Sequence, residues 1–391
     1  MQSVVRKSGR SPAAIVATAV LGTRLPILLA GAIAAWLVGT IPAPAAEAVW
    51  RVSSHEVGNM LARWDTFFYY TIATDGYRWD PAVFRHYNVV FFPLYPMLMR
   101  WGGAALGGHP LLAGLIISLA AFAGALVLVY RLAQLELGDD HAWRVILLIS
   151  TFPYALYFSA VYTESLFLFL SVGAFYAMRR GRLGWAALCG FGAGLTRPNG
   201  FWLALPLALL ALWPPRQDGS SAGGQRPVKR PLALVVAAVP ILGVTIFSSY
   251  LQLRFGDALA WVHGQAAWGV PLMLRRGAPD PIRLAGEPAI KPIEVITWIG
   301  NIAAFAAASY AIRPISRRLG PAYGAWIAVN IFPPVAAHLF MSLGRFISVL
   351  FPFFFWLAIR VPRDRLIRVA GVFAACQTVL AIWFFLWRPV V

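Results

Sequence analysis

The sequence predicts an all-α, polytopic membrane protein with about eleven transmembrane helices. Hydrophobic residues make up 60% of the 391 residues and charged residues only 12%, whereas soluble domains carry about 25% charged residues. Apolar runs close to the ~20 residues needed to cross a bilayer recur along the whole chain. Since no long polar domain separates these runs, we expect a single integral membrane domain over residues 1–391.

Eleven apolar segments are predicted to cross or enter the membrane. Arg24 is expected at the cytoplasmic end of the first, where its side chain can snorkel to the interface. Two short segments flank the sequence TRPNG and are expected to form a broken or re-entrant pair. The eleven segments are 22–41, 111–131, 142–161, 164–178, 183–196, 201–213, 231–252, 292–311, 321–340, 346–360 and 369–387.

Three polar stretches separate the apolar segments. Residues 43–110 form a first extracytoplasmic loop that is rich in Trp, Tyr and Phe beside charged residues, and we interpret this loop as the catalytic one. Residues 214–230 are basic and rich in Pro, Gly and Ser, which predicts a flexible cytoplasmic linker. Residues 253–291 form a second extracytoplasmic loop.

The distribution of basic residues predicts the orientation. Eighteen of the 33 Lys and Arg residues fall in the segments assigned to the inside, together with only five of the 15 acidic residues. Basic residues concentrate in cytoplasmic loops, so we expect the N-terminus in the cytoplasm and the aromatic loops outside. The same rule explains the net charge of +18 without a nucleic-acid partner, and we expect none.

Asp65 is the leading catalytic candidate in the first loop. Residues 58–76 can form an amphipathic helix along the membrane surface that carries Asp65 on its largely apolar face. A carboxylate there can act as a general base toward an acceptor hydroxyl. It can equally cap a helix or pair with Arg63, and the residues alone do not decide. Asp75 and Asp80 are interpreted as turn residues.

Further polar residues on the predicted outer side are candidates for substrate contacts. Glu164 suits a helix N-terminus, yet a carboxylate at the membrane edge is also a functional candidate. Arg345 and Arg197 lie beside aromatic residues, and arginine binds phosphate through two parallel hydrogen bonds; the alternative is general snorkelling toward lipid phosphates. Gln265 and Trp268 offer an amide and an aromatic face to a sugar.

No metal or cofactor is expected. His263 and His338 stand alone, without the spacing of paired metal ligands. Cys189 and Cys376 lie within apolar stretches, as small buried residues do. The sequence also lacks a glycine-rich dinucleotide motif, a P-loop and a GxSxG motif, which disfavours nucleotide-driven chemistry and serine hydrolysis.

In order along the chain, six motifs together resemble the PIG-V family of membrane mannosyltransferases, which are related to the enzyme that adds the second mannose of glycosylphosphatidylinositol (GPI). The resemblance implies a GT-C glycosyltransferase fold, a polyprenyl- or dolichyl-phosphate sugar donor and inversion at the anomeric carbon. The short, Arg- and Ala-rich chain is expected in a bacterial inner membrane, so the acceptor need not be GPI. The motifs are RWDTFFYYTIATDGY, FFPLYPMLMR, SAVYTESLFLFLS, GLTRPNG, FGDALAWVHGQAAWG and SLGRFISVLFPFF.

The resemblance assigns the catalytic role to Asp65, which matches the family's Trp-Asp position, and the expected partners are a lipid-linked sugar, a glycolipid or other glycan acceptor and membrane lipids. Arg345 and Arg197 are expected at the donor phosphate. Two alternatives remain: another GT-C transferase with a different lipid-phosphate sugar or a protein or lipid acceptor, or a lipid or sugar transporter. The residues expected to bind substrate are Trp64, Glu164, Asn199, Gln265 and Trp268.

Overall fold

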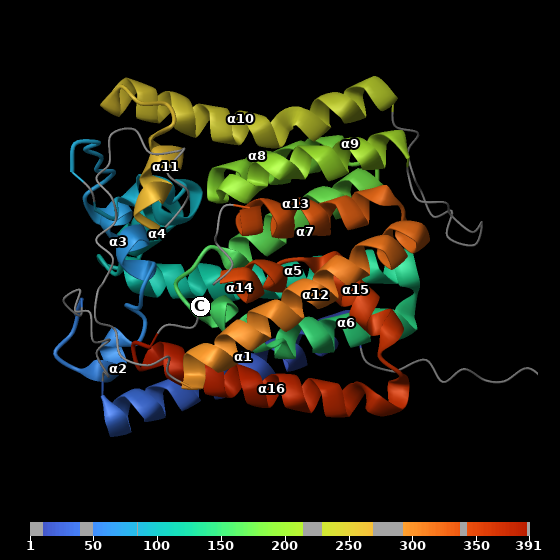
Figure 1. Cartoon of the computed structure of the whole chain (residues 1–391), viewed down its shortest axis with the longest axis horizontal. Helices are drawn as coiled ribbons and strands as arrows, with labels where there is room; N and C mark the ends of the chain where they lie inside the picture. The colour runs from blue at the N-terminus through green and yellow to red at the C-terminus, as the bar shows by residue number, and fades with distance from the viewer. Residues whose placement is uncertain are drawn as a thin grey trace, which may run out of the picture.

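The computed structural model describes residues 11–39, 50–83, 85–213, 229–268, 292–336 and 342–388. Most of the predicted linker 214–230, the end of the predicted second loop 253–291 and His338 therefore lie outside the described residues. Within the described ranges every regular element is a helix, as the sequence predicts. Figure 1 shows the long helices side by side, with their axes along the longest dimension of the molecule.

Four of the described helices are long and apolar enough to cross a membrane, or five if one bent pair counts as a single span. This confirms a membrane protein with several apolar helices. Each of the eleven predicted segments overlaps one or two of the described helices, but the number that cross the bilayer stays a prediction. The four are α1 (Pro12–Val38), α5 (Pro110–Leu137), α10 (Arg230–Phe255) and α16 (Arg363–Phe385), and the bent pair is α6 (Asp139–Thr151) with the 3-10 helix η2 (Pro153–Ser159).

The remaining described helices complete the bundle and the predicted outer loops. In the bundle they are α7 (Glu164–Arg179), α8 (Leu183–Thr196), η3 (Pro198–Leu203), α9 (Ala204–Leu212), α12 (Pro292–Leu319), α13 (Pro321–Ala336), α14 (Leu343–Ser348) and α15 (Phe351–Arg360). In the loops they are α2 (Glu56–Asn59), α3 (Thr66–Thr74), η1 (Asn88–Val90), α4 (Leu94–Ala105), α11 (Ala260–His263) and η4 (Gly264–Trp268).

The two ends of the bundle differ. Helices α3, α4 and α11, from the two predicted outer loops, gather at the left end in Figure 1. At the far end of α5 and α7, Arg179 Nε lies 2.5 Å from Glu136 Oε1, and the Tyr323 hydroxyl donates to the same oxygen over 2.8 Å. The segments predicted to share the outer side therefore meet at one end; which side of the membrane that end faces stays a prediction.

Arg24 does not snorkel, and that expectation is wrong. It lies in the middle of α1 with its side chain 2% exposed, and it donates to the backbone oxygens of Ser150 (2.6 Å) and Ala155 and to Gln377 Oε1 (3.2 Å). The Gln377 amide donates to the oxygen of Phe152 over 3.0 Å. These carbonyls flank the 80° break between α6 and η2. Since lipid offers no donors, a broken helix needs such partners.

The amphipathic helix predicted over residues 58–76 is also wrong, because it is interrupted between α2 and α3. Arg63 lies in the break, and its buried guanidinium donates to the oxygen of Asn59 over 2.5 Å and to that of Phe385 over 2.8 Å. These bonds tie the chain to the end of α16, and Trp64 adopts a left-handed backbone with φ 50°. Arg63 is therefore not the partner of Asp65.

Candidate functional site

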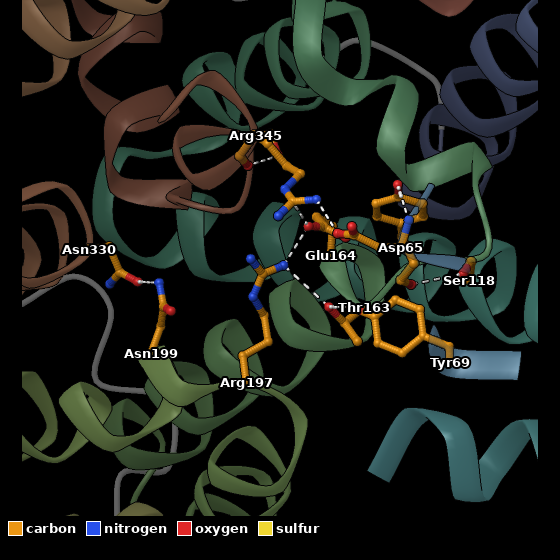
Figure 2. Close-up of polar contacts among 11 residues, drawn as sticks. Asp65, Tyr69, Ser118, Thr163, Glu164, Arg197, Asn199, Asn330 and Arg345 are labelled. Carbon is orange, nitrogen blue, oxygen red and sulfur yellow. Dashed lines mark hydrogen bonds and ion pairs between the residues drawn. The ribbon is translucent and has the colours of Figure 1, made fainter. Parts of the chain in front are cut away.

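Asp65 directly precedes α3 and points toward α14. Its Oδ2 accepts a hydrogen bond from Arg345 Nη1 over 2.7 Å, and its backbone N–H donates to the Tyr162 hydroxyl over 3.2 Å. The carboxylate makes no capping bond to α3, although it stands at the helix start. Figure 2 shows the carboxylate facing the guanidinium. Of the readings that the sequence left open, helix capping and pairing with Arg63 are thereby excluded.

Arg345 links Asp65 to a second carboxylate. Its Nε lies 3.4 Å from Glu164 Oε1, and its guanidinium carbon lies 5.7 Å from the centre of the Tyr162 ring. Burial lowers the pKa of Arg345, but the carboxylates of Asp65 and Glu164 raise that pKa more, so it ends well above its ordinary value. The guanidinium therefore stays charged between the two acids.

Glu164 is the buried centre of the cluster. Its side chain is 1% exposed, and Oε1 accepts from Arg197 Nη1 over 2.5 Å, while Oε2 has no hydrogen-bond partner among the described residues. Arg197 also donates to Thr163 Oγ1 over 3.2 Å, and this hydroxyl lies 3.2 Å from that of Tyr69. Two carboxylates and two guanidiniums thus alternate, and their charges cancel (Figure 2).

Local sequence explains why these groups meet. Glu164 opens α7, where the helix dipole favours an acid. Gly344 precedes Arg345 in α14, and a Cβ at that position would lie 2.3 Å from ring carbons of Tyr154 in η2. Only glycine permits this close approach of α14 to η2 without a shift. The approach carries Arg345 to Asp65 and Glu164.

The cluster borders a cavity of about 850 Å³. Asp65, Arg345 and Arg197 contribute polar groups to its wall, whereas Glu164, behind the two arginines, is not among the lining residues. The rest of the wall is mostly apolar, and much of it comes from η3, α10, α13 and the residues in and next to α11. Its apolar members include Phe201, Trp202, Ile241, Val244, Leu259, Trp261, Val262, Val329, Pro333 and Pro334.

The other predicted substrate residues lie around the same space. Trp64, Asn199 and Gln265 line the cavity. The Asn199 amide donates to Asn330 Oδ1 over 3.1 Å, as Figure 2 shows. Trp268 ends η4, and its side chain lies outside the described part of the chain. The cavity therefore brings together candidates from four separate stretches of sequence.

Sequence reasoning missed several residues at the site. Asn330 lies outside the six motifs, whereas Tyr69 and Tyr162 lie within the motifs of Asp65 and Glu164 but were not singled out as site residues. Burial is the first cause that raises the pKa of Tyr69 and of Tyr162, and neighbouring carboxylates add to it. Both phenols therefore stay neutral and serve as hydrogen-bonding groups. In the described ranges, no three His, Cys, Asp or Glu side chains are grouped to hold a metal ion.

Solved structures similar to this chain include two of the Archaeoglobus fulgidus oligosaccharyltransferase. The apo form is 12% identical, with a TM-score of 0.48 over 94% of this chain and 56% of that chain. The complex with an inhibitory peptide and a dolichol-phosphate is 14% identical, with a TM-score of 0.41 over 93% of this chain and 55% of that chain.

Curated relatives and a family model match the sequence itself. GPI mannosyltransferase 2 of Drosophila pseudoobscura pseudoobscura is 30% identical over 195 residues, which cover 45% of this chain and 41% of the relative. GPI alpha-1,6-mannosyltransferase 2 of Mus musculus is 28% identical over 244 residues, which cover 59% and 47%. The matches thus span less than half the length of either relative. Residues 40–205 match the family described as Mannosyltransferase (PIG-V), and the resemblance of this chain to the PIG-V mannosyltransferases is confirmed.

Proposed function

We propose that this chain is an inverting membrane glycosyltransferase of GT-C architecture. It moves mannose from a polyprenyl-phosphate-mannose donor to an acceptor hydroxyl at the extracytoplasmic face of a bacterial inner membrane. One observation carries the proposal: the Asp65 carboxylate and the Arg345 guanidinium lie 2.7 Å apart in the wall of one cavity of about 850 Å³. A base for the acceptor and a cation for the donor phosphate therefore meet where both substrates can enter.

The reaction requires one base and one stabilised leaving group. The acceptor oxygen attacks the anomeric carbon from the face opposite the phosphate, forms the new glycosidic bond and displaces the polyprenyl phosphate as the carbon–oxygen bond to phosphate breaks. Asp65 accepts the proton of the acceptor hydroxyl. Attack and departure on opposite faces invert the anomeric configuration. The cavity wall holds the two substrates in this alignment.

Arg345 and Arg197 stabilise the departing phosphate in this proposal. Of the Arg345 nitrogens, Nη1 donates to Asp65 and Nε faces Glu164, while Nη2 has no acceptor among the described residues. A phosphate oxygen can take this open position, and the charge that develops on the phosphate strengthens the contact in the transition state. Glu164 pairs with both guanidiniums, and the two arginines, but not Glu164, line the cavity.

The shape and lining of the cavity support a lipid-linked donor. Its charged groups, from Asp65, Arg345 and Arg197, lie together around Glu164, and the rest of its wall is mostly apolar. A phosphate at the charged groups and a hydrocarbon chain along the apolar wall match this division. The names of both curated relatives contain mannosyltransferase, which supports mannose as the sugar.

Transfer by the purified protein tests the proposal. In detergent, wild-type protein is expected to move labelled mannose from synthetic polyprenyl-phosphate-mannose to a lipid extract, while polyprenyl-phosphate-glucose serves as the competing donor. Asp65→Asn is expected to lower kcat by about 10²- to 10⁴-fold, the usual contribution of a general base. Asp75→Asn, at the other end of α3 and half-exposed, is the matched control and should leave kcat unchanged.

Three outcomes contradict the proposal. Near-normal turnover of Asp65→Asn removes Asp65 from the chemistry. Transfer of glucose in preference to mannose supports a different lipid-phosphate donor. Movement of the intact lipid-linked sugar across vesicles, without a new covalent product, supports a transporter.

A further inference from the structure

Two tryptophans in strained backbone conformations stack on each other beside the site. Among the described residues, Trp64 (φ 50°) and Trp387 (φ 68°) are the non-glycine positions with positive φ. Their ring centres lie 5.6 Å apart at an interplanar angle of 20°. Positive φ is unfavourable for a bulky side chain and persists only where surrounding contacts impose it. Two such residues in direct contact indicate that each holds the other.

Arg63 also connects the segment around Trp64 to the segment around Trp387. Its guanidinium carbon lies 5.1 Å from the centre of the Trp387 ring, and its Nε donates to the Phe385 oxygen over 2.8 Å. On the other side, the Arg63 oxygen accepts from the backbone N–H of Thr66 over 3.1 Å. The end of α16 and the turn after it therefore fix Arg63 and Trp64, and Arg63 in turn bonds to Thr66 on the other side of Trp64.

Asp65, the residue after Trp64, lies in the cavity wall. It follows Trp64 directly, so the backbone angles of Trp64 set the direction in which the Asp65 carboxylate leaves the chain. Trp64 and Phe384, the latter at the end of α16, line the same cavity as Asp65. A change in φ at Trp64 would rotate the carboxylate away from Arg345.

We infer that Trp387, with Arg63, is a positioning residue for the transfer reaction. The segment from Phe384 to Trp387 clamps Trp64 in its left-handed conformation, and the clamp aligns the Asp65 carboxylate with the acceptor hydroxyl. This inference rests on the proposed function for its effect on catalysis. The clamp itself is a property of the chain and is measurable without any substrate.

Three substitutions at position 387 separate positioning from general stability. Trp387→Ala and Trp387→Gly both remove the ring, but glycine accepts φ 68° without strain whereas alanine does not. The glycine variant is therefore expected to be the more stable of the two. Trp387→Phe keeps an aromatic ring against Trp64. Trp101→Ala, which removes a 63% exposed tryptophan of α4, is the control.

If Trp387 positions Asp65, the alanine and glycine variants lose activity equally despite their different stabilities. We expect kcat to fall by about 10²-fold in both, the cost of a catalytic group displaced by about 1 Å, with little change in KM. Trp387→Phe should restore most of the activity, and Trp101→Ala should match wild type. Activity that instead follows thermal stability across the series, with the glycine variant close to wild type, overturns the inference.

Hydrogen exchange of the peptide around Asp65 gives a readout that needs no turnover. The backbone N–H groups of Thr66 and Phe67 bond to Arg63 and Trp64, so loss of the clamp should speed their exchange by at least about tenfold. The phenylalanine variant should retain wild-type exchange. Unchanged exchange in the alanine and glycine variants refutes the clamp. If these variants exchange faster but even the wild-type protein shows no transfer, the clamp stands and the proposed function alone is refuted.

Discussion

Replacement of Glu164 by glutamine should weaken the fold while tightening the binding of a lipid phosphate. Glu164 is 1% exposed; it accepts a hydrogen bond from Arg197 over 2.5 Å and forms an ion pair with Arg345, whose Nε lies 3.4 Å away. Glutamine keeps an acceptor oxygen of the same shape but removes the negative charge. The four charged groups of the site then sum to +1 instead of zero.

The size of the stability loss follows from burial. Removal of one partner of a buried ion pair costs about 3–5 kcal/mol, because the other charge stays buried. Glutamine retains a hydrogen bond to a charged group, which contributes about 1.5–3 kcal/mol. We therefore expect the free energy of unfolding to fall by about 2 kcal/mol for Glu164→Gln, and by more for Glu164→Ala, which keeps no acceptor.

The gain in phosphate affinity follows from the added positive charge. Two unit charges 4 Å apart interact by about 4 kcal/mol at an effective dielectric constant of 20. A third of that energy, about 1.4 kcal/mol, corresponds to a tenfold tighter Kd for polyprenyl phosphate. The same change should slow product release and increase inhibition by polyprenyl phosphate.

Two measurements check this prediction in detergent: unfolding by titration with a denaturing detergent, and titration of polyprenyl phosphate against intrinsic fluorescence. The control is Asp75→Asn, which breaks the exposed Asp75–Arg78 pair and should cost less than about 1 kcal/mol. A double-mutant cycle with Arg197→Gln isolates the pair, since its coupling energy vanishes if the two residues act separately. A Glu164→Gln protein as stable as wild type, with unchanged phosphate affinity, would refute the reasoning.

Three further predictions follow from other parts of the fold. Arg24→Met should destabilise the protein by about 1–3 kcal/mol for each carbonyl left without a donor, measured as a lower thermal midpoint, and leave the KM of the surviving protein unchanged. Gly344→Ala should lower both kcat and stability, because its methyl group meets a tyrosine ring at 2.3 Å. Gly371→Ala, with nothing within 4 Å, should leave kcat unchanged and raise stability slightly, because alanine is the better helix former inside α16. Burial raises the pKa of the Tyr95 and Tyr162 hydroxyls well above the ordinary value of 10. Their contribution to stability is therefore full below pH ~10 and is lost as the pH rises further. Tyr95→Phe should consequently reduce the fall of the thermal midpoint at alkaline pH.

The helices could be predicted from the sequence because apolar runs report local structure. Residues 183–196 were predicted as one segment and form α8 with the same bounds. The segment 142–161 was predicted as a single span, and nothing in that prediction indicated the 80° bend between α6 and η2. Pro153 at the break is a visible signal, but the donors that stabilise the bend come from Arg24 and Gln377, which lie far away in sequence.

The charged residues of the candidate site could be predicted from the sequence, but the contacts between them and their neighbours could not. Charge distribution and motif order placed Asp65, Glu164 and Arg345 on one side, and the structure gathers all three. The interruption before Asp65 was missed because Arg63 there bonds to Phe385 in α16, and no periodicity in the first loop indicates a partner so far away in the sequence. Side-chain pairing across the bundle is a tertiary property, so it needs coordinates.

The break between α6 and η2 also bears on the order in which this protein is assembled during synthesis. The first helix supplies Arg24 to the freed carbonyls, but Gln377 belongs to α16, the last of the described helices to leave the ribosome. Before α16 is inserted, the carbonyls at the break between α6 and η2 have Arg24 but not Gln377 as a donor, and Arg63 lacks the Phe385 carbonyl. Insertion of α16 therefore supplies Gln377 to the break and the Phe385 carbonyl to Arg63 together, so that a chain that stalls before α16 would lack both contacts.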